Sequence, residues 1–204
     1  MKKILLTGFE PFLDYKINPT MTVAKELDGK TIEDYEIESF ILPVDFNQSE
    51  KLIIEKMEQL KPDIVVSLGL AAGRFKITPE RIAINVKDGD RDNNGFAPLD
   101  QLINSNGPDA YFSTLPVRSI INNLIENGFP AEMSNTAGTY LCNNIMYSVL
   151  DYIKVNDLRC KAGFIHMPAC HELAIIHGKI PSWSQKDLIS AIEISLEVIA
   201  KEGD

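Results

Sequence analysis

Several residue types and patterns are scarce or missing in this sequence of 204 residues. It has only three cysteines, an odd number without paired spacing, which fits a reducing compartment better than a disulfide framework. No hydrophobic run approaches the length of a membrane span, so we expect no membrane segment and a cytoplasmic location. Acidic residues outnumber basic ones by 29 to 20, and a net charge of −9 argues against a nucleic-acid partner.

Several familiar catalytic and nucleotide-binding signatures are also missing. The sequence has no Gly-x-Ser-x-Gly elbow, which argues against a serine α/β-hydrolase. It has neither Gly-x-Gly-x-x-Gly nor a phosphate loop ending in Lys-Ser/Thr, which removes the commonest nucleotide sites. No internal repeat, linker or low-complexity segment divides the chain. Because 45% of the residues are hydrophobic, we expect residues 1–204 to form one domain around a substantial core.

Short apolar runs alternate with stretches of helical periodicity along the whole chain. The apolar runs predict strands, at residues 3–7, 35–42, 63–68, 82–86, 131–134 and 162–167. The periodic stretches predict helices, at residues 18–27, 46–60, 116–127 and 140–150 and from residue 184 onward. Residues 87–108 are rich in Asp, Asn and Gly without periodicity, which is typical of a functional or mobile loop. The alternation predicts an α/β fold with a mainly parallel twisted sheet and helices on both faces.

The stretch 134–144 contains the first candidate nucleophile. A turn of small polar residues around Gly138 precedes the helical run, so Cys142 is expected in the first turn of a helix. Unpaired N–H groups and the positive end of the helix dipole would lower the pKa of the thiol there, and could hold an oxyanion. Alternatively, Cys142 is one more small buried hydrophobic residue, as most free cysteines are.

Histidine is scarce as well, with only three in the chain. His166 ends a buried-type strand, and the C-terminal end of a parallel strand suits a catalytic base; a hydrogen-bonded core histidine is the alternative. A zinc site formed by His166, Cys170, His171 and His177 is a further possibility, although their spacing matches no zinc motif.

Glu80 and a pair of aromatic residues have two interpretations each. Glu80 either pairs with Arg74 or Arg81, or accepts from an imidazole N–H and completes a Cys–His–acid triad. Phe9 and Phe12 lie in a loop directly after a strand, where they form either a lid on the core or one wall of an apolar pocket.

Three segments in this order resemble the signatures of the pyroglutamyl peptidase I (pyrrolidone-carboxylate peptidase) family of cysteine peptidases. They are residues 8–12 with Asn18-Pro19, residues 77–85 and residues 134–143, and residues 111–117 and 164–168 are similar too. The resemblance spans nearly the whole chain. It implies a phosphorylase/hydrolase-like α/β fold and an exopeptidase that removes N-terminal pyroglutamate (5-oxoproline) from peptides.

The resemblance also implies roles for individual residues. Cys142 would be the nucleophile, His166 the general acid and base, and Glu80 the residue that orients the imidazole. Substrate binding would involve an aromatic wall and its neighbours, namely Phe9, Phe12, Asn18, Leu70, Tyr140 and Leu141. No metal and no cofactor is implied, and a homotetramer is expected because family members often form tetramers.

The sequence departs from the family pattern in two loops. Residues 69–74 contain Leu70 and Ala72 where Gln and a further Gly are common. Residues 87–93 do not reproduce the family's Asp-Ala-Arg-Ile-Pro-Asp-Asn, so Arg91 is the candidate for the arginine expected near the oxyanion. These changes leave one alternative function, a catalytically impaired homologue that binds lactams without turnover.

Overall fold

The structure is a computed structural model and describes residues 1–202. Its strands are β1 (Lys2–Phe9), β2 (Thr31–Ile32), β3 (Tyr35–Leu42), β4 (Ile64–Leu70), β5 (Thr78–Pro79), β6 (Ile82–Ile84), β7 (Ala110–Phe112), β8 (Lys161–Met167), β9 (Ala169–Cys170) and β10 (Ser182–Trp183). Its helices are α1 (Pro19–Leu27), α2 (Ser49–Leu60), α3 (Val117–Glu126), α4 (Leu141–Val155), α5 (His171–His177) and α6 (Gln185–Lys201).

The main sheet has six strands in the order β2-β3-β1-β4-β8-β5. The four inner strands are parallel, while β2 and β5 run antiparallel at the two edges. Every residue of β4 is buried, as a β-branched strand covered on both faces should be. The expected mainly parallel sheet is therefore confirmed, with short antiparallel strands added at its edges.

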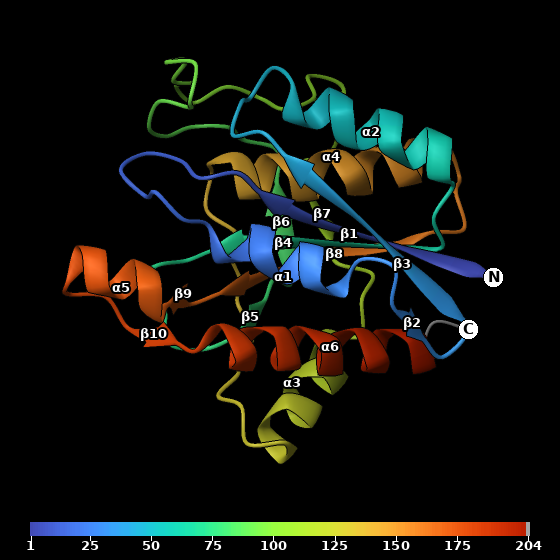
Figure 1. Ribbon diagram of the computed structural model, residues 1–204. Helices are drawn as coiled ribbons and strands as arrows, with labels where there is room; N and C mark the ends of the chain where they lie inside the picture. The colour runs from blue at the N-terminus through green and yellow to red at the C-terminus, as the bar shows by residue number, and fades with distance from the viewer. Residues whose placement is uncertain (203–204) are drawn as a thin grey trace.

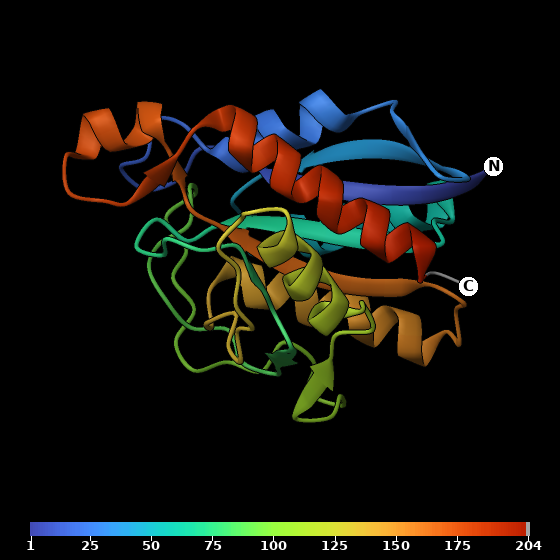
Figure 2. The ribbon, with the colours of Figure 1, turned by 90° about the horizontal axis from the view of Figure 1, so that it is seen from below.

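Helices cover both faces of this sheet, which gives three layers (Figure 1). Helices α1, α3 and α6 lie on one face, where Figure 2 shows α3 and α6 in the foreground, and α2 and α4 lie on the other. Alternate residues of β1 enter the two cores: Ile4 and Leu6 pack with α1, α3 and α6, whereas Leu5 and Phe9 pack with α2 and α4. The single α/β unit is as the sequence predicts.

Two of the predicted strands differ from the structure. The strand expected at residues 82–86 covers only Ile82–Ile84, which is β6. This strand pairs with β7 in a separate antiparallel sheet and leaves Ile84 exposed. Residues 131–134 form no strand, because they pair with the chain at only two isolated positions, Ile77 with Ala131 and Glu80 with Ser134. Both segments lie beyond the β5 edge and are too short to extend the main sheet.

Side-chain caps set where helices α1 and α6 begin. Asn18 caps α1 because its side chain accepts from the backbone N–H of Thr20. Ser184 caps α6 because its side chain accepts from the backbone N–H of Asp187. Helix α2 begins at Ser49 and not at residue 46, because the carboxylate of Asp45 accepts from the N–H groups of residues 47 and 48 and holds them in a turn. Helix α5 and the short strands β2, β5, β7, β9 and β10 were not predicted from the sequence.

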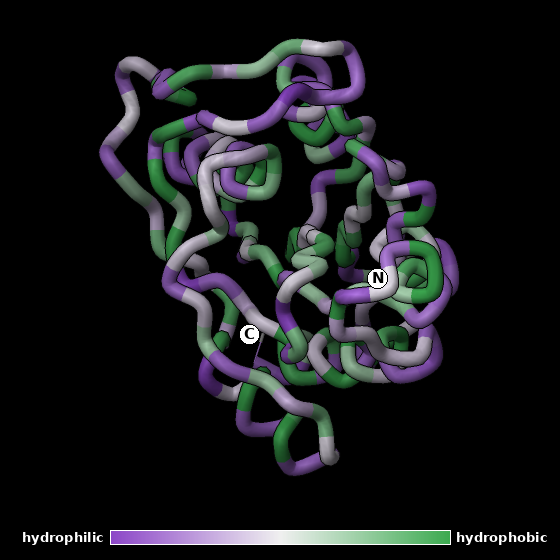
Figure 3. Tube along the Cα trace, turned by 90° about the vertical axis from the view of Figure 1, so that its left-hand side faces the viewer, coloured by the Kyte–Doolittle hydropathy of each residue, from purple (hydrophilic) through white to green (hydrophobic). Residues whose placement is uncertain are grey.

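The loops that follow the parallel strands gather at the end of the molecule away from the two termini (Figure 1). Figure 3 looks onto this end, where hydrophilic and hydrophobic stretches alternate along the loops. Residues 87–108 contain no helix or strand, as predicted, yet buried Asp92 orders part of this loop by accepting from the backbone N–H groups of Phe46, Asn94 and Phe96. Among residues 1–202, no helix combines the length and the apolar character that a membrane crossing requires.

Candidate active site

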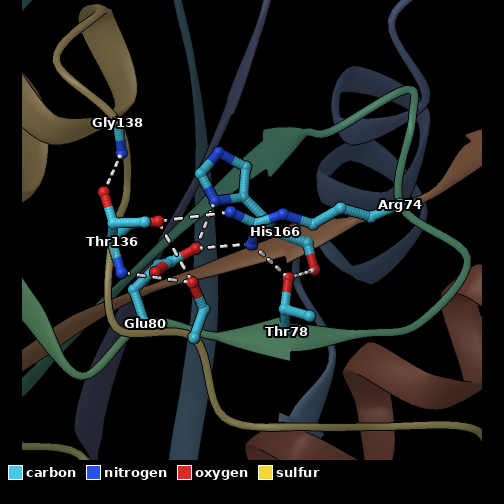
Figure 4. A network of polar contacts seen from close by, with 7 residues as sticks. Arg74, Thr78, Glu80, Thr136, Gly138 and His166 are labelled. Carbon is cyan, nitrogen blue, oxygen red and sulfur yellow. Dashed lines mark hydrogen bonds and ion pairs between the residues drawn. The ribbon is translucent and has the colours of Figure 1, made fainter.

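His166 and Glu80 form a buried pair at the edge of the main sheet (Figure 4). His166 is the sixth residue of β8, and the two-residue strand β5 pairs antiparallel with β8, Thr78 opposite His166. This pairing places Glu80, directly after β5, with its Oε1 2.7 Å from His166 Nδ1. Because a carboxylate only accepts hydrogen bonds, Nδ1 is the protonated nitrogen of a neutral imidazole and Nε2 keeps its lone pair.

The imidazole of His166 lies against the backbone of Gly69 in the neighbouring strand β4. A Cβ at Gly69 would stand 2.8 Å from Cδ2 of His166 and 2.5 Å from Cε1 of Phe164, closer than real Cβ atoms come. The Phe164 ring packs on the imidazole with their centroids 4.9 Å apart. The absence of a side chain at Gly69 therefore creates the space that the ring occupies.

Cys142 is the second residue of α4, in the first turn as predicted, and the residue is half-buried. The turn before the helix passes through Gly138 at φ +78°, a backbone conformation that favours glycine. Tyr140, at the N-cap, makes no side-chain capping hydrogen bond, so the first-turn N–H groups have no side-chain cap. An anion forming next to Cys142 would meet these groups and the positive end of the helix dipole.

The side chain of Asn143 fixes this first turn. Its Oδ1 accepts from the N–H of Ile84, and its Nδ2 donates to the carbonyls of Ile84 and Val86, at 2.8 to 2.9 Å. Asn143 is fully buried. Sequence reasoning missed this residue, and its only signal was its place next to the candidate nucleophile.

Burial dominates the electrostatics of both reactive side chains. Desolvation raises the pKa of the Cys142 thiol to about 12 and the Glu80 charge adds to this rise, although Arg74 and the backbone N–H of Cys142 act to lower it. The expected net lowering by the helix terminus is thus wrong, because the slot removes more hydration from the thiolate than the helix restores. Desolvation lowers the pKa of His166, against the opposing effect of Glu80, so the ring is a neutral base.

A narrow apolar slot opens beside Cys142. It contains about 260 Å³ of empty space, including space open to solvent, and its lining consists of Phe9, Phe12, Asn18, Val44, Leu70, Tyr140, Leu141 and Cys142. All six residues that the resemblance implies for substrate binding therefore surround one slot, together with the candidate nucleophile. Val44, at the start of the loop after β3, is the lining residue that the sequence did not indicate.

Aromatic contacts and a capping amide shape the walls of this slot. The rings of Phe12 and Tyr140 stack with their centroids 6.3 Å apart, and Phe46 meets Tyr140 edge-on at 5.1 Å. Asn18 is buried, and its Nδ2 donates to the carbonyl of Glu10 while its Oδ1 accepts from Thr20. Phe9 and Phe12 thus form one wall of an apolar pocket, the second of the two interpretations open from the sequence.

The two arginines considered from the sequence lie in different surroundings. Arg91 is exposed in the loop beside the slot, where its backbone carbonyl accepts from the hydroxyl of Tyr140 at 3.2 Å. Its side chain does not line the slot, and its role near an oxyanion stays a prediction. Arg74 instead contacts Glu80 directly, with Nη1 2.7 Å from Oε1. Glu80 therefore makes both contacts that the sequence had offered as alternatives, one with the arginine and one with the imidazole.

The zinc alternative finds no support in the structure. Among residues 1–202, no three His, Cys, Asp or Glu side chains come together as a group that could hold a metal ion. His171, one of the proposed ligands, bonds through Nδ1 to the hydroxyl of Ser182 at 2.9 Å. His166 is engaged by Glu80.

Comparison with known proteins agrees with the geometry. Residues 2–202 match the family model described as pyroglutamyl peptidase. The chain is 58% identical over 204 residues to the pyrrolidone-carboxylate peptidase of Lysinibacillus sphaericus, with 100% of both chains covered. It is 53% identical over 195 residues to the pyrrolidone-carboxylate peptidase of Halalkalibacterium halodurans, which covers 95% of this chain and 97% of the relative.

Solved structures of the same family share the fold of the chain. A mutant pyrrolidone carboxyl peptidase from Pyrococcus furiosus superposes with a TM-score of 0.95 at 42% identity, covering 98% of this chain and 99% of that one. The pyrrolidone carboxyl peptidase from Thermococcus litoralis gives the same TM-score at 41% identity, covering 98% and 94%. With residues 2–202 matched by the family model and the whole chain aligned to a relative 58% identical, the chain belongs to the pyroglutamyl peptidase family of cysteine-type hydrolases.

Proposed function

We propose that Cys142, His166 and Glu80 carry out the removal of N-terminal pyroglutamate from peptides in this chain. The observation that supports this most strongly is the 2.7 Å contact between His166 Nδ1 and Glu80 Oε1 near the C-terminal end of β8. The apolar slot that contains Cys142 opens at the same ends of the neighbouring strands, where Phe9 ends β1 and Leu70 ends β4. The Glu80 contact keeps the Nε2 lone pair of His166 free to accept a proton.

The slot suits pyroglutamate better than an ordinary N-terminus. Pyroglutamate is a flat, neutral lactam without a charged α-amino group, so it can enter an apolar slot without losing the hydration of a charge. Asn18 has a second amide N–H besides the one that it donates to Glu10, and this group can bind the lactam carbonyl. A free amino terminus would be left poorly solvated, and the site should reject it strongly.

The reaction proceeds through an acyl-enzyme. His166 Nε2 takes the proton of the Cys142 thiol, which is necessary because burial keeps that thiol neutral in the free enzyme. The sulfur attacks the pyroglutamyl carbonyl, and the first-turn N–H groups of α4 stabilise the oxyanion. The imidazolium then protonates the leaving amine as the C–N bond breaks. Water, deprotonated by His166, hydrolyses the thioester and restores the thiol.

A fluorogenic assay tests this proposal. Wild-type protein should release coumarin from a pyroglutamyl-coumarylamide and leave the free-amino glutaminyl analogue intact. Cys142→Ala should abolish release, whereas Cys160→Ala, a change just before the opposite end of β8, should retain it. Turnover at the wild-type rate in Cys142→Ala would disprove the nucleophile, and an inactive wild type would favour the impaired alternative, for which the described residues give no support.

Location and assembly complete the proposal. The three free cysteines and the acidic composition fit a cytoplasmic enzyme without disulfides. A homotetramer is the assembly that the family resemblance implies. Light scattering during gel filtration should give a mass of four chains, and a monomeric mass at micromolar concentration would contradict this.

A further inference from the structure

Arg74 makes contact with the same carboxylate oxygen that holds the imidazole (Figure 4). Arg74 Nη1 lies 2.7 Å from Glu80 Oε1 and 2.6 Å from Thr78 Oγ1. The same Glu80 oxygen lies 2.7 Å from His166 Nδ1. The other oxygen of Glu80, Oε2, is buried without a hydrogen-bond partner among the described residues. The orientation of this carboxylate therefore depends on two donors at a single oxygen, Arg74 and His166.

The same guanidinium also reaches the segment that precedes the nucleophile. Its Nη2 donates to the backbone carbonyl of Thr136 at 3.2 Å, in the turn that leads into α4 and Cys142. One planar guanidinium thus bonds to Glu80, directly after β5, and to the turn before Cys142. A lysine has the charge but not this fixed pair of donor directions.

The charge of Arg74 acts on both reactive groups. The charged groups that influence His166 and Cys142 are the same two, Glu80 and Arg74, and Arg74 lowers the pKa of each side chain. Without the Arg74 cation, the two negative charges of the Glu80 carboxylate and the developing Cys142 thiolate would be balanced by the His166 imidazolium alone. Arg74 therefore influences Cys142 and His166 both through its hydrogen bonds and through its charge.

We propose that Arg74 is a positioning residue of the reaction, which fixes the Glu80 carboxylate against His166 and ties that pair to the turn before Cys142. This rests on the roles proposed above for the three catalytic residues. The simpler alternative is an ion pair that contributes to stability alone. Such a pair would leave the pH dependence of the histidine and the activity of the folded protein unchanged.

Three variants separate these possibilities. Arg74→Gln removes the charge, Arg74→Lys keeps the charge without the fork, and Lys76→Gln is the matched control. Lys76 lies two residues away in the same loop and pairs with Glu132 at the surface, so its loss changes the net charge equally without touching Glu80. The measurements are kcat and its pH profile on the pyroglutamyl-coumarylamide, an NMR titration of the His166 ring, and the melting temperature.

We expect kcat of Arg74→Gln to fall by at least about tenfold, since an oriented base typically contributes 10²–10⁴-fold. The acid limb of its profile and the NMR titration of His166 should both move to higher pH. Arg74→Lys should keep the titration of His166 close to that of the wild type while recovering kcat only in part. Lys76→Gln should match the wild type in all three measurements.

Two results would overturn the proposal. One is an Arg74→Gln protein whose kcat and His166 titration are the same as those of the Lys76→Gln control. The other is a loss of kcat in Arg74→Gln without a shift of that titration, which would indicate a structural role alone. If Arg74→Gln does not fold, Arg74→Lys decides, because a wild-type kcat there refutes the need for the fork and a loss at an unchanged melting temperature supports it. The NMR titration needs no turnover, so it tests Arg74 even if the proposed activity fails.

Discussion

Replacing Gly69 by alanine tests how closely the imidazole of His166 is positioned. The added Cβ would stand 2.8 Å from His166 Cδ2 and 2.5 Å from Phe164 Cε1. Carbon atoms pack at about 3.5 Å or more, so the imidazole has to retreat by roughly 0.7 Å and the phenyl ring by roughly 1 Å. The imidazole cannot retreat freely, because its Nδ1 is held at 2.7 Å from Glu80.

A displacement of this size should be costly for the reaction and tolerable for the fold. Misplacing a reacting group by about 1 Å can cost about 10²-fold, so we expect kcat/KM of Gly69→Ala to fall by roughly 10–100-fold. Overpacking typically costs about 1–3 kcal/mol, and the melting temperature should drop by several degrees without loss of the folded state. Steady-state kinetics on the pyroglutamyl-coumarylamide and thermal unfolding measure the two effects.

The matched control is Gly73→Ala. Gly73 lies in the loop after the same strand, its φ is not positive, and a Cβ there would meet nothing within 4 Å. Gly73→Ala should therefore keep wild-type kinetics and stability. Equal kcat/KM in the two variants would refute the view that the Gly69 backbone sets the position of the ring.

Further predictions concern pH, the slot and the loop that supports it. Because desolvation lowers the pKa of His166 below its usual 6.5, the acid limb of the kcat/KM profile should lie below pH 6.5. The free energy of unfolding should decrease as the pH falls below 6.5, because the unfolded chain binds the histidine proton more readily than the folded one. Iodoacetamide should inactivate the free enzyme at a rate that still rises above pH 9, because the pKa of Cys142 is raised from 9.0 to about 12, and a plateau at neutral pH would contradict this. Phe12→Ala should raise KM by about tenfold through lost apolar contact, whereas Phe112→Ala, an exposed phenylalanine, should leave KM unchanged; equal KM values would argue against the aromatic wall. Asp92→Ala orphans three backbone N–H groups and should lower the melting temperature by roughly 4–8 °C, and an unchanged melting curve would argue against its role in the loop.

The periodicity of the sequence was sufficient to predict the architecture and the positions of two of the three proposed catalytic residues. Buried runs such as β4 and β8 have few alternatives in an α/β chain, so the end of β8 could be assigned to the sheet edge, with His166 there. The small polar turn followed by a helical pattern placed Cys142 in the first turn of α4. Local pattern determines these features, and local pattern is visible in a sequence.

The contacts that complete the site depend on pairings between distant segments. Glu80 reaches His166 through β5, a strand of only two residues that runs antiparallel to β8, and no periodicity indicates so short a strand. The position of Val44 in the slot and the fork of Arg74 likewise follow from tertiary packing. The sequence also suggested a lowered pKa for Cys142, because the helix terminus is visible in a pattern whereas the depth of burial is not.

The proposed mechanism requires the thiol of Cys142, activated by His166, to attack the pyroglutamyl carbonyl. Treatment with pyroglutamyl chloromethyl ketone followed by peptide mapping by mass spectrometry identifies the attacking residue. We predict one adduct, on Cys142, that forms in proportion to the loss of activity and far more slowly in His166→Asn, with Cys160 and Cys170 unmodified. An adduct on another residue that accounts for the inactivation, or full turnover by protein already modified at Cys142, would contradict the mechanism.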